Sequence, residues 1–167
     1  MTGRHKHTDV THQPRRDSMY EERVHDPYQA RGKYHEPTVC PDCGAVFHEG
    51  RWRWGNAPEG SHSHRCPACA RMHDRIPAGV LTLQGEFFDA HRTEIMHLIQ
   101  HQEATEKPEH PLERIMAIDE TEQGTTVSFT GVHLARRAGE ALHHAYQGEL
   151  DIGFNDKDDL FRVRWSR

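Results

Sequence analysis

No stretch of the sequence approaches the ~18 consecutive apolar residues of a membrane span, and the N-terminus lacks the apolar core of a secretory signal peptide. Apolar residues are scarce throughout, since Ala, Val, Ile, Leu, Met, Phe, Trp, Tyr and Cys together make up 34% of the 167 residues. Even with the 13 glycines added, the share stays below the ~45–50% usual for globular domains. We therefore expect a cytoplasmic protein without a membrane segment, part of which lies outside any packed core.

The sequence also lacks an excess of positive charge. It has 21 Lys and Arg against 26 Asp and Glu, which gives a formal net charge of -5 at pH 7. A protein that coats duplex nucleic acid is strongly basic, so that class is excluded. Local basic patches remain compatible with nucleic-acid binding.

Common catalytic motifs are missing as well. The sequence has no GxxxxGK[ST] phosphate loop, no HExxH, no GxSxG, and no GxGxxG after an expected strand. Glu140 and His144 are one helical turn apart and could imitate an acid–base pair, but such spacing often arises by chance. We expect no enzymatic activity and no small-molecule substrate.

The first 36 residues have almost no aliphatic side chains. Val10, Met19 and Val24 stand isolated among charged residues and histidines. Such a segment cannot bury enough apolar surface to offset the entropy of ordering it. We predict a disordered polar tail over residues 1–36, which could become ordered on an RNA or protein partner.

Two CPxC pairs give the clearest positive signal. The four cysteines are Cys40, Cys43, Cys66 and Cys69. Two residues between thiolates let the backbone fold around the sulfurs and direct both at one ion, so two such knuckles form a closed site of four thiolates. Zinc is the expected metal, and a closed site leaves no open coordination position for catalysis. We predict a four-cysteine zinc ribbon over residues 37–85, with short strands at 45–48, 51–54 and 79–83.

Two other uses of CxxC pairs match the sequence less well. An iron site of the rubredoxin type also uses CPxCG knuckles, but Ala70 stands where the second pair would have glycine. A thioredoxin-like motif occurs singly at the start of a helix in a βαβ unit, whereas this chain has two pairs. The duplication favours metal coordination over redox chemistry.

The remainder of the chain indicates an α+β fold. Apolar residues at steps of three and four predict a helix over residues 86–104. Two strand pairs flank a second helix, which begins near Val132 and is expected to have Ala145 on its apolar face. We therefore predict a ββαββ unit over residues 105–167, with the earlier helix packed on the same sheet.

Arginine and tryptophan alternate between the two knuckles, from Arg51 to Trp54. On a strand, such alternation places both arginines on one face and both tryptophans on the other. We favour burial of the tryptophans, because aromatic side chains dominate small cores, and leave the arginines open as phosphate contacts. The candidate nucleic-acid-binding residues, all cationic or aromatic, are Arg51, Trp52, Arg53, Trp54, Arg65, Arg71, Arg162 and Arg164.

The chain resembles a family of uncharacterised bacterial proteins with two CPxC knuckles, in the segments VCPDCGAVFHEGRWRWG, HRCPACARMHDRIPAGVLTLQGEF, HPLERIM and TTVSFTGVHLARRAGEALHHAYQGEL. This resemblance covers most of residues 38–167. More distantly, the chain is similar to the zinc-bearing N-terminal part of the archaeal and eukaryotic adaptor that accompanies the large ribosomal subunit during export and maturation. The resemblance implies that the four cysteines are zinc ligands and that the partner is rRNA or a ribosomal protein.

The leading hypothesis is a non-enzymatic, zinc-stabilised protein that binds RNA or a ribosomal particle. The first alternative is an adaptor whose acidic surface binds a protein partner, which the net charge of -5 favours. The second alternative is a rubredoxin-like redox protein, which requires iron in place of zinc.

Overall fold

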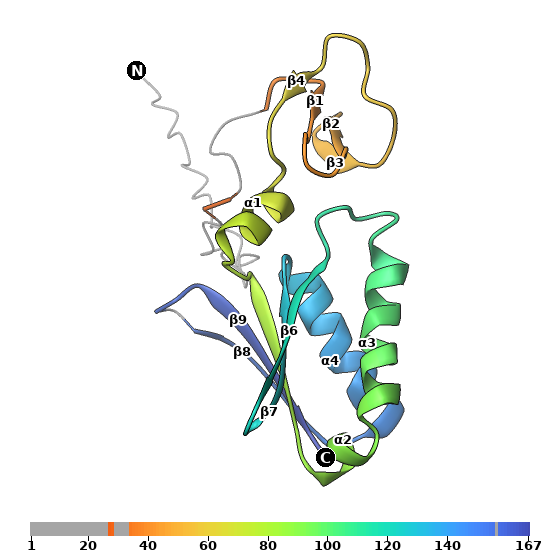
Figure 1. Ribbon diagram of the computed structural model, residues 1–167, viewed down its shortest axis with the longest axis vertical. Coiled ribbons are helices and arrows are strands. Elements are labelled where there is room, and N and C mark those ends of the chain that lie inside the picture. Colours follow the sequence, from red (N-terminus) through yellow and green to blue (C-terminus); the bar gives the residue numbers. More distant parts are fainter. Residues whose placement is uncertain (1–26, 29–33, 156) are drawn as a thin grey trace, which may run out of the picture.

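The computed structural model of the protein describes residues 27–28, 34–155 and 157–167. The predicted tail over residues 1–36 therefore falls largely outside the described residues. The described part contains two sheets. They lie at opposite ends of the molecule, with a short helix between them (Figure 1). The predicted α+β fold class is confirmed.

The smaller sheet holds the two cysteine knuckles. Its strands, in the spatial order β3-β2-β1-β4, are β1 (Thr38–Val39), β2 (Val46–His48), β3 (Arg51–Arg53) and β4 (His62–Ser63). The turn between β2 and β3 contains Glu49 and Gly50, both at positive φ. The Glu36 carboxylate accepts hydrogen bonds from both of their backbone amides, at 2.7 and 3.1 Å, and so closes this turn.

Residues at the end of the predicted tail belong to the ribbon. The Tyr34 ring packs against Phe47 and Trp52, with centroids 4.9 and 5.4 Å away. Together with the Glu36 contacts, this moves the start of the ribbon from residue 37 to at least Tyr34. The aromatic ring lies directly over the small ribbon core, which has little other apolar material to cover it.

The larger sheet has five strands in the order β6-β7-β5-β9-β8. They are β5 (Gly79–Gln84), β6 (Ile115–Thr121), β7 (Gly124–Phe129), β8 (Glu149–Asn155) and β9 (Leu160–Ser166). The two hairpins β6–β7 and β8–β9 are those predicted from the sequence. The central strand β5 lies between them, antiparallel to β7 and parallel to β9.

The position of β5 corrects one predicted boundary. The sequence pattern predicts a strand at 79–83 within a ribbon over residues 37–85. Leu81 and Leu83 of β5 are instead fully buried in the core of the five-stranded sheet. The ribbon therefore ends with helix α1 (Pro67–Asp74), a helix that the sequence analysis did not predict.

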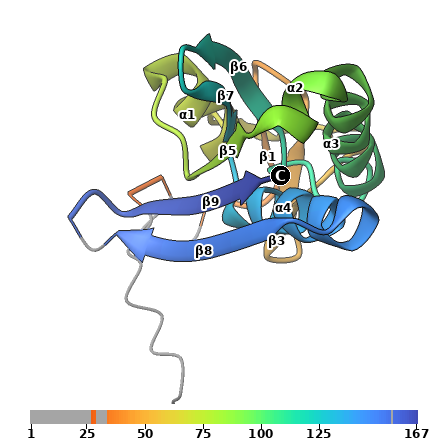
Figure 2. The same cartoon turned by 90° about the horizontal axis from the view of Figure 1, so that it is seen from below.

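Three helices, α2 (Glu86–Ala90), α3 (Arg92–Glu106) and α4 (Val132–Tyr146), lie on one side of the five-stranded sheet (Figure 2). The predicted helix 86–104 is thus two helices, because the backbone leaves the helical region at His91, with φ -119° and ψ 21°. Of the predicted apolar face of α4, Ala145 is exposed, and Gly139 is buried instead. The main core residues are Leu81, Leu83, Phe88, Ile95, Ile99, Val127, Phe129, Leu134, Leu142, Val163 and Trp165.

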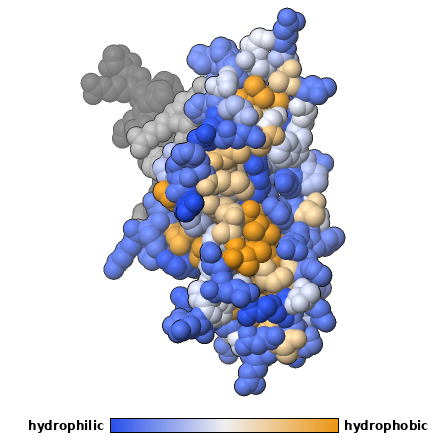
Figure 3. All heavy atoms as spheres, in the orientation of Figure 1, coloured by the Kyte–Doolittle hydropathy of each residue, from blue (hydrophilic) through white to orange (hydrophobic). Residues whose placement is uncertain are grey.

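Strand β6 forms one edge of this sheet. Ile118 on this strand is 43% exposed, and Figure 3 shows apolar surface in the middle of an otherwise mostly hydrophilic face. Asp119 and Glu120 follow at once, and charges of this kind protect an edge strand from pairing with other chains. Within the described part of the chain, no helix combines the length and apolarity needed to span a bilayer.

Candidate metal centre

The four cysteine sulfurs meet at one point. The Sγ atoms of Cys40, Cys43, Cys66 and Cys69 all lie within 4.8 Å of one another, and no disulfide joins them. The Sγ atoms of Cys43 and Cys66 are 3.8 Å apart. A tetrahedral ion with metal–sulfur bonds of about 2.3 Å requires sulfur–sulfur separations of roughly 3.8 Å. The residues present therefore fit a tetrathiolate metal ion.

The parallel pairing of β1 with β4 brings the two knuckles together, since Val39 lies opposite Ser63. In the first knuckle, Gly44 adopts φ 80°, and its amide bonds to the Cys40 carbonyl at 2.9 Å. Glycine tolerates this left-handed conformation, which turns the chain back around the sulfurs. The knuckle is then closed by the Cys40 amide, which donates to the Ala45 carbonyl.

The second knuckle is the N-terminus of helix α1. Cys66 is the N-cap residue, Pro67 follows within the first turn, and the Cys69 amide donates to the Cys66 sulfur at 3.4 Å. The Cys66 amide in turn donates to the Cys40 sulfur at 3.3 Å. Burial opposes ionisation of Cys66 and raises the pKa of its thiol, and the backbone N–H of Cys69 at the helix N-terminus offsets part of this effect.

A residue far along the chain completes the surroundings of the cysteines. Arg114 precedes β6, is only 5% exposed, and donates to the sulfurs of Cys43 at 3.2 Å and Cys69 at 3.4 Å. Its Nε donates to the Pro111 carbonyl at 2.6 Å. A buried guanidinium needs anionic partners, and the cysteine sulfurs supply them. Arg114 matches no motif in the sequence and is not among the predicted site residues.

The cysteines differ in their electrostatic surroundings. Burial opposes ionisation of Cys43, but the Ala45 amide and the Arg114 guanidinium outweigh it and lower the pKa of this thiol to about 7. Burial raises the pKa of Cys66 and of Cys69. Burial also works against the charge of Arg114, yet its hydrogen bonds to Cys43 and Cys69 hold its pKa above the usual range. Arg114 therefore stays cationic beside the sulfurs.

The candidate nucleic-acid-binding residues of the ribbon have mixed environments. Trp52 is 8% exposed among aromatic rings, and the Trp54 indole N–H donates to the Lys107 carbonyl at 2.7 Å. Arg53 pairs with Glu49 at 2.9 Å. Arg51 is exposed, and no ion pair to it is found among the described residues.

The other four candidates lie on α1, beside it and on β9. Arg65 pairs with Asp42, whereas Arg71 is 6% exposed and donates to the Ile76 carbonyl at 3.1 Å. Arg162 pairs with Asp158 at 2.6 Å, and Arg164 lies 4.0 Å from Asp151. The eight candidates thus occupy separate parts of the molecule, and Trp52 and Arg71 are structural.

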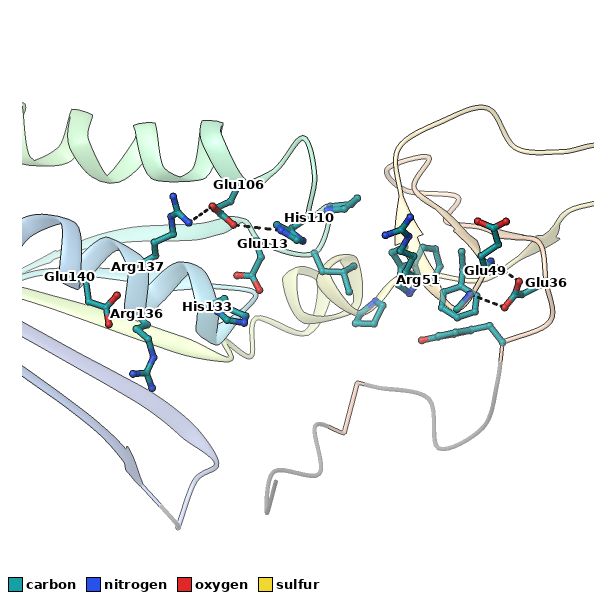
Figure 4. A pocket seen from close by; sticks show the side chains of 17 residues that line it. Glu36, Glu49, Arg51, Glu106, His110, Glu113, His133, Arg136, Arg137 and Glu140 are labelled. Carbon is teal, nitrogen blue, oxygen red and sulfur yellow. Dashed lines mark hydrogen bonds and ion pairs between the residues drawn. The ribbon is translucent and has the colours of Figure 1, made fainter. Parts of the chain in front are cut away.

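A cleft of about 1420 Å³ separates the ribbon from the N-terminal half of α4 (Figure 4). One wall carries the rings of Tyr34, Phe47 and Trp52, whose centroids are 4.9 to 5.6 Å apart. The opposite wall carries charged and titratable side chains: Glu106, His110, Glu113, His133, Arg136, Arg137 and Glu140. Glu106 is already paired there, with Arg137 at 2.8 Å.

The fold and the cysteine cluster together define an α+β protein with a four-cysteine metal centre. Comparisons with protein-family models, with curated proteins and with solved structures found no match to this chain.

Proposed function

We propose that this is a non-enzymatic, cytoplasmic binding protein in which the four cysteines hold a structural zinc ion and the cleft binds a basic segment of a protein partner. Four thiolates suit zinc, which is redox-silent and stabilises small folds. With all four positions taken by protein, the ion has no place for a substrate. Free cysteines that remain reduced are typical of the cytoplasm.

The cleft is the observation that carries the choice of partner. Its size is suited to a peptide segment, and it combines an aromatic wall with a surplus of carboxylates. Carboxylates that line it outnumber arginines, and the whole chain has a net charge of -5. Lysine and arginine side chains are attracted both to carboxylates and to the faces of aromatic rings. Basic extensions of a ribosomal protein would satisfy this chemistry, in line with the resemblance to a ribosomal adaptor.

The test measures binding of a fluorescently labelled Lys/Arg-rich peptide to the full chain by fluorescence anisotropy. Glu140 is exposed on α4 at the cleft, so E140K is expected to weaken binding several-fold by charge repulsion. E122K, the same change in the exposed turn between β6 and β7, is the matched control and should leave binding unchanged. Equal binding by E140K and wild type, or no binding of the basic peptide at all, would contradict the proposal.

RNA is a second candidate ligand, and one specific observation favours it. Arg162 and Arg164 lie opposite Val80 and Thr82 of β5, on the sheet face that α2, α3 and α4 do not cover. The β7 residues on this face, Thr126 and Ser128, are uncharged, and the carboxylates near the two arginines are those of Asp151 and Asp158. Exposed ion pairs such as Arg164 with Asp151 are weak and would yield to a phosphate.

The same anisotropy assay with a single-stranded oligoribonucleotide separates the two ligands. Binding that R164E abolishes and E140K leaves intact, and that falls steeply with salt, would assign the function to RNA. Binding of the basic peptide alone, unaffected by R164E, would exclude RNA at this face.

A further inference from the structure

Arg114 connects two parts of the molecule that otherwise touch little. Its backbone belongs to the larger unit, because its amide donates to the Thr130 hydroxyl and its carbonyl accepts from the Thr130 amide, both at 2.9 Å. Its side chain belongs to the ribbon, where it reaches Cys43 and Cys69. One residue therefore bridges the end of β7 and the metal centre.

A second connection runs alongside the first. Trp54 of the ribbon donates to the carbonyl of Lys107, at the end of α3, and the Arg114 guanidinium lies 5.5 Å from the centroid of the Trp54 ring. Leu112, from the connection between α3 and β6, packs against the ribbon core. The segment 107–114 is thus held against the ribbon by three contacts, which involve Lys107, Leu112 and Arg114.

Charge explains why the guanidinium is retained at this buried position. Four thiolates with a divalent ion form a dianionic centre, and Arg114 is a buried cation in contact with it. Hydrogen bonds to metal-bound thiolates draw electron density from the sulfurs and orient them, as outer-shell partners do in other metal sites. Arg65 is also near the centre, but it is exposed and pairs with Asp42.

We propose that Arg114 is a positioning residue of the metal centre and that the loaded centre, through Arg114, fixes the ribbon against the five-stranded unit. A bound ion fixes the positions of the four sulfurs, two of these sulfurs accept hydrogen bonds from Arg114, and Arg114 holds the segment 107–114. The metal centre then stabilises the arrangement of the two units in addition to the ribbon itself.

The test compares R114M with R65M, an identical substitution at an exposed arginine next to Cys66. Each full-length variant is loaded with Co²⁺, and the sulfur-to-cobalt absorption band, the rate of metal transfer to a chelator and hydrogen exchange of segment 107–114 are measured. In R114M the tetrathiolate band should persist but move to lower energy. Metal release should be about 10-fold faster or more, and amides of 107–114 should exchange faster while β5 and β9 stay protected. R65M should match the wild type in all three.

Two results would overturn the proposal. One is an R114M protein that matches the wild type in both metal release and hydrogen exchange. The other is a wild-type protein whose segment 107–114 stays equally protected after the metal is removed. Should R114M not fold, R114K, which keeps the charge but loses the planar fork, should show the same changes to a smaller degree. An R114K protein identical to wild type would also overturn the proposal.

Discussion

The carboxylate of Glu113 accepts a hydrogen bond from the backbone amide of Leu134 at 2.9 Å. Helix α4 has glycine, Gly131, as its N-cap residue and no side-chain cap of its own, so Glu113 provides the cap from a distant segment. A Cβ atom on Gly131 would lie 2.3 Å from the Glu113 carboxylate, which explains the glycine. Adjacent residues thus serve different units, because Glu113 caps α4 and Arg114 contacts the cysteines.

Removing the Glu113 cap should destabilise the protein. The pH dependence of the stability should show that the Glu113 carboxyl is buried. E113A is expected to lower the free energy of unfolding by about 1 kcal/mol, as the loss of other helix caps does. Burial raises the pKa of Glu113, although the bond from Leu134 and the nearby His133 and His110 act in the opposite direction. Stability from a raised carboxyl pKa is fully present below the unfolded-state pKa and is lost as pH rises through the folded-state pKa.

E113Q keeps an acceptor for the Leu134 amide but does not ionise. It should therefore be more stable relative to wild type at pH 7 than at pH 4, measured by urea unfolding at both values. If the stability difference between E113Q and wild type is the same at both pH values, ionisation of the Glu113 carboxyl does not destabilise the fold, which contradicts the prediction. E113A serves as the comparison in which the cap is lost at either pH.

Loss of one metal ligand should unfold the ribbon and spare the five-stranded sheet. Cys40 and Cys66 are 1% and 0% exposed, and the ribbon core is separate from the core of the larger unit. Structural zinc in small modules contributes on the order of 10 kcal/mol to folding, so C40S or C66S should lose the metal and the near-UV signal of Trp52 and Trp54. A70S, a substitution beside the second knuckle, is the control. Native spectra with bound metal in C66S would contradict the assignment of the site.

Metal affinity should fall as the pH falls, because protons compete with the ion for sulfur. Burial raises the pKa of Cys66 and Cys69, so these two groups bind protons in the metal-free fold at neutral pH. We expect affinity to drop by at least about tenfold per pH unit between pH 7 and 6, measured by competition with a chelator of known proton affinity. An affinity that does not change over this range would mean that fewer thiolates bind the metal than the geometry indicates.

Helix α4 should tolerate no side chain at Gly139. A Cβ atom there would lie 2.5 Å from Cγ1 of Val163, a fully buried core residue on β9. G139A is expected to cost about 1–3 kcal/mol through overpacking, in spite of the higher helix propensity of alanine. G153A on β8, where the added atom meets nothing within 4 Å, should change stability little. Thermal or urea unfolding of both variants tests the contrast.

Features encoded by local pattern were predicted well. The spacing within the pairs Cys40–Cys43 and Cys66–Cys69 was sufficient to identify a metal site, because the backbone of a CxxC pair directs both of its sulfurs at one ion. Both hairpins and α4 also followed from alternation and three-to-four periodicity. Within each knuckle, hairpin or helix, the residues that form it are close in sequence.

Features that depend on distant partners were missed. Strand β5 has an alternating pattern but pairs with strands at least about 40 residues away, so the sequence did not indicate which sheet it joins. Arg114 follows Glu113 just before a strand, where charged residues are common, and only the fold brings it to Cys43. Tyr34 was counted in the tail because its composition is polar, although an aromatic residue so close to Cys40 could have suggested packing on the ribbon.

The central position of β5 has a consequence for the order in which the molecule can assemble during synthesis. Its parallel neighbour β9 emerges from the ribosome about 80 residues later, so the sheet stays incomplete until nearly the whole described chain has been made. The four cysteines all lie before β5, so they can bind a metal ion before Arg114 and β9 have been made. The nascent chain can therefore hold a metal-bound ribbon while Leu81 and Leu83 are still exposed to solvent, because β9 has not yet been made. During that interval the growing chain exposes apolar strand residues that are buried in the finished core.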